Sequence, residues 1–271
     1  MPELPEVETV RRGLVPLLTG RRVSRVTVRH RGLRWPVAAN FERELETRAI
    51  VDVDRRGKYL LVNCNGGTLI VHLGMSGSLR VVPAATPADR HDHLDLVLDD
   101  GRLLRFNDPR RFGSVHWVTD DPLTHPLLAG LGPEPLAPGF DGDSLYVATR
   151  TRSAAIKLVL MDSHVLAGIG NIYASEALYR ARIHPARSAN RVSLERYRRL
   201  AQAIHTTLEL ALAAGGSTLR DFVDAHGAAG CFQQQYTVYG RTGEPCHHCG
   251  SAIRSMRQGQ RSTFYCPRCQ R

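Results

Sequence analysis

Four cysteines near the end of the chain constrain how its last segment can fold. Cys246-x₂-Cys249 is followed, after sixteen residues, by Cys266-x₂-Cys269. Two CxxC pairs at this spacing are typical of a tetrahedral zinc site, not of a disulfide framework. Because four thiolates leave no open position for chemistry, we expect one structural Zn²⁺. The metal would fold a β-hairpin that is too small to have its own core.

The charge of the chain indicates a polyanionic partner. Its 271 residues carry a formal net charge of +10, and the predicted hairpin tip contains Arg254, Arg257 and Arg261. Such a balance favours nucleic acid as the partner. No apolar run is long enough for a membrane span. The amino terminus is acidic where a signal peptide would be basic, so we expect a soluble, cytoplasmic protein that does not bind membranes.

The first half of the chain has the pattern of short β-strands. Residues 20–118 contain apolar runs separated by turn signals such as Gly66-Gly67 and Asp100-Gly101. This spacing predicts a sandwich or a barrel, and one helix near 40–48 is expected to begin at Asn40. The predicted strands are residues 23–28, 50–53, 59–62, 68–72 and 94–98.

The second half has a helical pattern. Residues 120–142 are rich in proline and glycine, which is typical of a linker. Apolar periodicity then predicts three helices, at 154–161, 172–181 and 194–214. The fold class is therefore α+β.

The amino terminus, MPELPEVETV, allows two readings. Removal of the initiator methionine would leave Pro2 as a terminal secondary amine, which is partly unprotonated near neutral pH and could attack an aldehyde-like carbon. The simpler reading is a helix start, with proline and glutamates in the first turn. Its buried face would be Val7, Val10, Leu14 and Leu17. Both can hold, since a packed helix would fix Pro2 and Glu3.

Polar clusters between the predicted strands are not needed for a sandwich. Lys58 precedes an apolar strand, and His91-Asp92-His93 resembles a metal pair without a third ligand, so we favour phosphate or structural contacts there. Residues 107–113, NDPRRFG, offer cations for phosphates and an aromatic wedge for the base stack. In the second half, the glycine-rich segment before Asn171 could receive a phosphate at a helix start.

In combination these motifs resemble those of bacterial formamidopyrimidine-DNA glycosylase, across essentially the whole chain. The matching pieces are PELPEVE at 2–8, RRGKYL at 55–60, HLGMSG at 72–77, NDPRRFG at 107–113, GIGNIYASE at 168–176 and QRSTFYC at 260–266 with the CxxC pairs. The resemblance implies a catalytic β-sandwich domain with an N-terminal helix (1–135), a linker (136–150), a helix–two-turn–helix domain (151–230) and a zinc-finger hairpin (236–271).

The resemblance also implies an activity. The family removes oxidised purines, such as 8-oxoguanine and formamidopyrimidines, from damaged double-stranded DNA after flipping the nucleotide out, and then cleaves the strand by β,δ-elimination. Pro2 would attack C1′ and Glu3 would protonate the sugar ring oxygen. Lys58 would be an acid/base, and Arg261 would bind phosphate and assist the second elimination. A monomer is expected.

The resemblance implies further DNA contacts. A void-filling group would occupy the space of the flipped nucleotide, and other residues would grip phosphates. The first group is Met75, Arg110 and Phe112, and the second is His91, Arg110, Arg152, Lys157, Asn171 and Arg261. The chain departs from the family pattern at Gly230-Cys231-Phe232, where an aromatic residue commonly follows the glycine, which puts fine lesion preference in doubt.

Two alternatives remain at this stage. Endonuclease VIII-like enzymes, which prefer oxidised pyrimidines, typically begin PEGPE, whereas this chain has Leu4. A non-catalytic zinc-dependent DNA-binding relative would share the charge, the fold and the zinc. The state of the amino terminus separates them, because a retained Met1 would block the amine.

Overall fold

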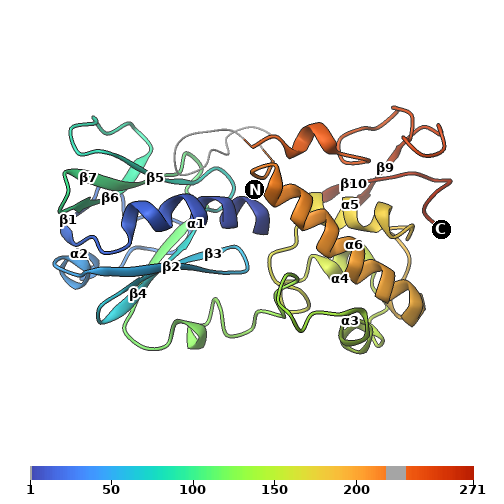
Figure 1. The fold of residues 1–271 in the computed structure, drawn as a ribbon, viewed down its shortest axis with the longest axis horizontal. Coiled ribbons are helices and arrows are strands. Elements are labelled where there is room, and N and C mark those ends of the chain that lie inside the picture. Colours follow the sequence, from blue (N-terminus) through green and yellow to red (C-terminus); the bar gives the residue numbers. More distant parts are fainter. Residues whose placement is uncertain (1, 218–229) are drawn as a thin grey trace. The chain divides into compact units, whose positions relative to one another are not determined.

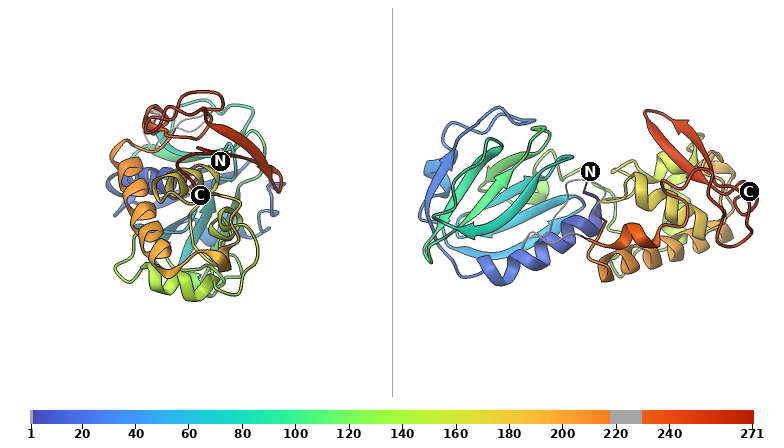
Figure 2. Two further views of the ribbon diagram at one scale, coloured as in Figure 1. Left: turned by 90° about the vertical axis from the view of Figure 1, so that its right-hand side faces the viewer. Right: turned by 90° about the horizontal axis from the view of Figure 1, so that it is seen from above.

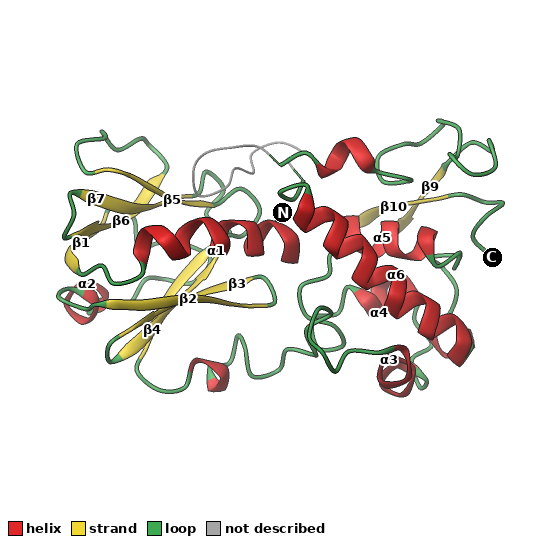
Figure 3. Cartoon of the chain, viewed as in Figure 1, coloured by secondary structure: helices red, strands yellow, loops and turns green. Residues whose placement is uncertain are grey.

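A computed structural model describes residues 2–217 and 230–271, and Met1 lies outside this part. The chain divides into two compact units (Figure 1). The first contains the described residues up to 129, with 214–217 and 230–231, and the second contains 130–213 and 232–271. Strands dominate the first unit and helices the second, in agreement with the predicted α+β class (Figure 3).

Two four-stranded antiparallel sheets form the first unit, and this confirms the sandwich (Figure 2). One sheet has the order β1-β6-β7-β5 and the other β2-β3-β4-β8. The strands are β1 (Val23–Val28), β2 (Ile50–Arg56), β3 (Tyr59–Cys64), β4 (Gly67–His72), β5 (Ser78–Pro83), β6 (Asp92–Leu98), β7 (Arg102–Asn107) and β8 (Ser114–Val118).

Helix α1 (Leu4–Leu18) packs on β2, β3 and β5, so it contacts both sheets. Val7, Val10 and Leu14 are buried, as predicted, but the stripe continues through Leu18 and not Leu17. Leu18 lies four residues after Leu14, about one helical turn, so both side chains point towards the core. Helix α2 (Phe41–Leu45) is shorter than the predicted 40–48, and its N-cap Asn40 makes no side-chain capping bond.

Three strands, β5, β7 and β8, were not among the predicted runs. Strand β7 illustrates why, since its Arg105 interrupts the apolar pattern. The side chain is buried and donates two hydrogen bonds of 2.9 Å to Asp95, which lies directly opposite on β6. A bidentate ion pair lets an arginine lie inside a sheet. A single sequence does not reveal the partner.

The second unit contains α3 (Gly142–Thr149), α4 (Ile156–Leu160), α5 (Asn171–Arg180) and α6 (Leu194–Ala213). Helix α3 lies within residues 136–150, for which the sequence predicted only a linker. Asp141 caps it by accepting from the Ser144 amide, and Tyr146 stacks edge-on against Tyr197 of α6. The unit also contains a hairpin of β9 (Arg254–Gln258) and β10 (Arg261–Tyr265), which packs on α5.

Shorter elements of the described residues include 3₁₀ turns at Pro122–Thr124, Ala189–Arg191 and Phe232–Gln235. A tight turn at Gly259, where φ is 57°, joins β9 to β10. Along residues 2–217 and 230–271, no helix has the length and apolar character that crossing a membrane requires.

Candidate functional site

The start of α1 fixes the residues next to the amino terminus. Glu3 is the N-cap, and its carboxylate and that of Glu6 form a reciprocal capping box; the Glu3 amide donates to Glu6 Oε2 at 2.8 Å. The other Glu6 oxygen accepts from the Ser217 amide at 2.8 Å. Pro2, Glu3 and Glu6 are all buried. A capping box stabilises a helix start, so Pro2 and Glu3 are presented from a rigid base.

Lys58 lies in the two-residue turn between β2 and β3, at the end of the strands, as predicted. The neighbouring His72 ring lies 4.8 Å from that of Tyr59. Burial, with the positive charges of Lys58 and Arg34, lowers the pKa of His72 to about 4. His72 Nδ1 accepts from the Gly74 amide at 3.1 Å, so this imidazole is neutral near pH 7 with its proton on Nε2.

Asp108 joins the loop of residues 72–77 to the loop of residues 107–113. Its side chain is fully buried; Oδ1 accepts from the Ser76 hydroxyl at 2.8 Å and Oδ2 from the Gly113 amide at 2.7 Å. Its carbonyl oxygen lies 2.9 Å from His93 Nε2. At Gly74, where φ is 66°, a Cβ would come within 2.4 Å of the Gly113 amide nitrogen. The two loops therefore form one rigid platform.

This platform exposes an apolar and cationic trio. Met75 is 38% exposed and Phe112 is 44% exposed, unusual values for such side chains. The Arg110 guanidinium lies 4.7 Å from the centre of the Phe112 ring, within cation–π distance. Exposed apolar side chains on a rigid loop can enter a base stack, and the cation can contact a phosphate.

In the cluster at residues 91–93, Asp92 and His93 are buried, whereas His91 is only half-buried. His93 is buried against Asp108, and Asp92 accepts from the Asn107 amide and pairs with Arg105. His91 is half-buried beside a hollow of about 390 Å³ that is lined by the three arginines Arg29, Arg90 and Arg111 and by the two carboxylates Asp89 and Asp92. His91 can therefore meet a phosphate, whereas the other two residues have structural partners.

In the second unit, Lys157 does not lie on the surface. Its side chain is completely buried, and Nζ donates to Asn171 Oδ1 at 2.6 Å, Thr263 Oγ1 at 2.7 Å and the Ser262 carbonyl at 3.3 Å. Asn171 in turn donates to Ser262 and Tyr239. The two residues hold β10 against the start of α5. A direct phosphate contact by Lys157 would require it to leave these oxygens, so this arrangement favours a positioning role.

Arg261 and Arg152 remain accessible. Arg261 is exposed at the first position of β10, opposite Gln258 across the tight turn, so it lies at the hairpin tip as predicted. Arg152 is exposed and forms a 2.9 Å ion pair with Asp162. Exposed ion pairs of this kind contribute little to stability and exchange readily for a phosphate.

Glu176 is a buried carboxylate with an unusual number of donors. The amides of Thr237, Val238 and Tyr239 and the Thr237 hydroxyl all donate to it. It fastens the segment that leads into the zinc hairpin to α5. The sequence did not predict this role of Glu176. It also did not predict that Glu6 would contact Ser217 or that Asp108 would contact Ser76, because these partners are distant in the chain.

The four predicted metal ligands converge. All four sulfur atoms lie within 4.8 Å of one another, with 3.9 Å between Cys246 and Cys269 and 3.5 Å between Cys249 and Cys266. Tetrahedral Zn–S bonds of about 2.3 Å place the sulfurs about 3.8 Å apart, so the cluster fits zinc. With four protein ligands the metal would be structural.

Comparison with known proteins agrees with this geometry. Three family descriptions match the chain: the formamidopyrimidine-DNA glycosylase N-terminal domain at residues 1–115, its H2TH domain at 131–223, and a zinc finger found in FPG and IleRS at 243–271. Formamidopyrimidine-DNA glycosylases of Alkalilimnicola ehrlichii and Stutzerimonas stutzeri are 57% and 56% identical to it, with full coverage of both chains.

Solved structures are similar over the same length. The MutM (Fpg) protein of Thermus thermophilus is 41% identical with a TM-score of 0.89, covering 99% of this chain and 98% of its own. A Lactococcus lactis Fpg mutant bound to Fapy-dG-containing DNA is 35% identical with a TM-score of 0.91, covering 99% of both chains. Identity at this level over complete chains, together with the converging cysteines and the rigid amino-terminal helix, shows that the chain belongs to the formamidopyrimidine-DNA glycosylase family.

Proposed function

We propose that this protein excises oxidised purines from duplex DNA, with Pro2 as the nucleophile. As a member of its family it is a DNA glycosylase of base-excision repair with an associated lyase activity. The observation that carries the residue assignment is the buried start of α1, where Glu3 and Glu6 cap each other beside Pro2. A reactive group gains most from being held in one geometry.

The chemistry follows from a terminal secondary amine. Unprotonated Pro2 nitrogen attacks C1′, the bond from C1′ to the base breaks, and the sugar ring opens as Glu3 supplies a proton to its ring oxygen. The resulting iminium acidifies the adjacent C–H bonds, so elimination can release first the 3′ and then the 5′ phosphate. Lys58 acts as an acid/base in these transfers. Arg261 binds the phosphate that leaves in the second elimination.

Base flipping is assigned to the platform that Asp108 holds. Met75 and Phe112 fill the space of the extruded nucleotide, and Arg110 contributes charge. His91, Arg110, Arg152 and Asn171 contact phosphates. Zinc, bound by its four cysteines, holds the hairpin that carries Arg261 and takes no part in the reaction. The net charge of +10 favours binding to the DNA backbone, and membership of the family favours a cytoplasmic monomer that acts on the chromosome.

Reduction with borohydride tests the nucleophile. A Schiff base on DNA containing 8-oxoguanine should be reduced to a stable amine, giving a covalent complex whose peptide map places the adduct on Pro2. Pro2→Gly keeps a terminal amine and should retain weaker trapping, whereas an N-terminal tag, or retained Met1, should abolish both trapping and cleavage. Glu3→Gln should bind DNA without excising the base. An adduct on Lys58 with Pro2 unmodified would overturn the assignment.

A further inference from the structure

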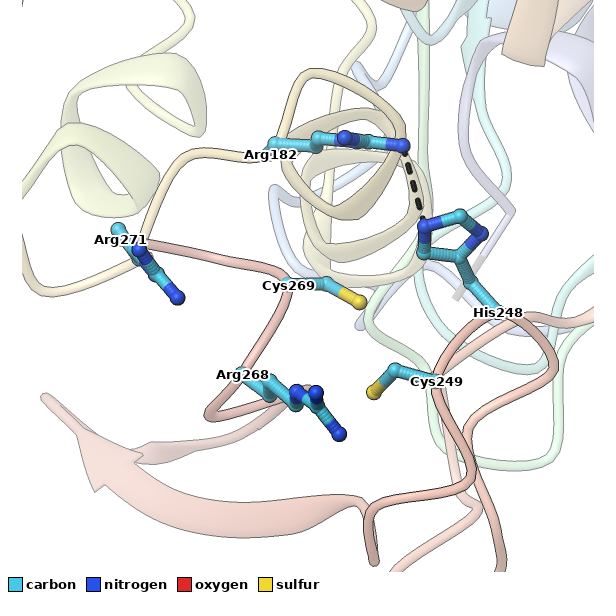
Figure 4. A pocket seen from close by; sticks show the side chains of 6 residues that line it. All are labelled: Arg182, His248, Cys249, Arg268, Cys269 and Arg271. Atoms are coloured by element: carbon cyan, nitrogen blue, oxygen red, sulfur yellow. Dashed lines mark hydrogen bonds between the residues drawn. The ribbon is translucent and has the colours of Figure 1, made fainter.

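A basic pocket of the second unit lies beside the zinc ligands. It is a hollow of about 590 Å³, and Figure 4 shows its lining side chains, which come from the end of α5, from the loop between Cys246 and Cys249 and from the last residues of the chain. The lining residues are Arg182, His248, Cys249, Arg268, Cys269 and Arg271. No acidic side chain is among them.

The three arginines of this pocket are not neutralised by an acidic side chain of the described residues. Within the described part of the chain, Arg182, Arg268 and Arg271 form no ion pair, whereas Arg198 pairs with Asp143 and Arg241 with Glu244. A bound zinc with four thiolates would carry a charge of −2 (four negative sulfurs and one divalent cation). The three guanidinium groups offset this charge together with that of the terminal carboxylate of Arg271, so the pocket carries no net negative charge when the metal is bound.

Arg182 occupies a backbone position that disfavours arginine. It follows the last turn of α5 with φ of 57°, and the amides of Arg182 and Ile183 donate to the carbonyls of Tyr179 and Leu178. This is the helix C-terminus at which glycine is the usual residue, because a Cβ is strained at positive φ. A strained residue in a position that glycine could fill suggests that its side chain has a use.

The pocket is held in shape from two sides. The Arg196 guanidinium donates to the Arg182 carbonyl and to an oxygen of the terminal carboxylate of Arg271, which ties the end of α5 to the end of the chain. Arg182 Nη2 lies 3.3 Å from His248 Nε2, a contact drawn in Figure 4, so the imidazole accepts and orients the guanidinium. Guanidinium donors from two segments, the end of α5 and the end of the chain, thus line one hollow.

We propose that this pocket is a phosphate-binding site separate from the hairpin tip. Arg261 begins β10 and the pocket follows its end, and five residues of strand span roughly 17 Å. Arginine guanidinium groups match phosphate oxygens in geometry and charge. The phosphate belongs either to a free phosphate compound or to a DNA backbone beyond the lesion, and only the second source depends on the proposed function.

Two binding measurements separate these sources. Titration of zinc-loaded protein with inorganic pyrophosphate, followed by calorimetry, should show a site that Arg268→Gln and Arg182→Gly each weaken about tenfold or more. Arg191→Gln, which removes one exposed arginine elsewhere in the same unit, is the control. If the source is a DNA backbone, each pocket variant should also lower the slope of log affinity against log salt by about 0.9.

Arg182→Gly supplies a readout that a structural role would not give. Glycine relieves the positive φ, so this variant should melt at a higher temperature than the parent while binding phosphate more weakly. If the pocket variants match Arg191→Gln in both pyrophosphate affinity and salt slope, the proposal is wrong. The proposal would also be overturned if Arg268→Gln lost zinc to a chelator but bound phosphate as the parent does. The arginines would then stabilise the metal site and not bind phosphate.

Discussion

Replacement of Asp108 by asparagine tests whether one buried carboxylate organises the flipping platform. Oδ2 accepts from the Gly113 amide at 2.7 Å, and Oδ1 accepts from the Ser76 hydroxyl at 2.8 Å and from the Arg110 amide at 3.3 Å. An amide has one accepting atom. In its better orientation, asparagine keeps the Gly113 bond and takes a reversed bond to Ser76. The Arg110 amide loses its bond to residue 108 and keeps only the Ser76 hydroxyl oxygen, at 3.3 Å, as an acceptor.

The cost can be worked from these contacts. Hydrogen bonds to a charged group contribute about 1.5–3 kcal/mol each, and asparagine weakens one and loses another, so we expect the unfolding free energy to fall by about 2 kcal/mol. The same displacement of Arg110 and Phe112 should slow excision of 8-oxoguanine by up to about 30-fold, since 1.4 kcal/mol corresponds to a factor of ten. Affinity for undamaged duplex should fall less than the excision rate, because Arg110 is the one proposed phosphate ligand that this change displaces.

Denaturant unfolding and single-turnover excision measure the two effects separately. Ser76→Ala is the matched control: it removes one donor but leaves the carboxylate and its bond to Gly113, so a loss of about 1 kcal/mol is expected. Wild-type excision together with wild-type stability in Asp108→Asn would refute the reasoning, because the platform would then not depend on this carboxylate.

Three further predictions concern the rest of the chain. Lys157→Met should lower the unfolding free energy by about 2–3 kcal/mol and weaken DNA binding without changing its salt slope; a slope reduced by about 0.9 would instead reveal a phosphate contact. The hydrogen bonds and charges of Arg11, Arg12 and Arg55 overcome the effect of burial and lower the pKa of Glu8 from 4.5 to about 2. This carboxylate therefore contributes up to about 3 kcal/mol above pH 4.5, a contribution lost as the pH falls to about 2, so acid titration of Glu8→Gln should show a flatter stability profile in that window. Removal of zinc, or Cys246→Ser, should unfold the hairpin and weaken DNA binding, as elemental analysis and circular dichroism with binding assays would show; full binding by metal-free protein would contradict this.

Patterns that are local in the chain predicted their structures well. The CxxC spacing predicted four converging sulfurs, the proline and glutamates predicted the start of α1, and the glycine turns predicted two hairpins. In each case the interacting residues lie within a few positions of one another, or follow a spacing imposed by one metal. The resemblance of ordered motifs across the chain predicted the family, which the comparisons confirm.

Tertiary structure alone decided the roles of the buried polar residues. Lys157 contacts Thr263, 106 residues away, Glu6 contacts Ser217, 211 residues away, and Asp108 contacts Ser76, 32 residues away. A charged residue in a sequence suggests a solvated side chain or a ligand, and only its partners show that it is buried. Burial of a charge is tolerated when donors or acceptors surround it. Their convergence depends on how the whole chain packs, so the sequence pattern predicted where the chemistry lies, while the fold decided which residues hold it in place.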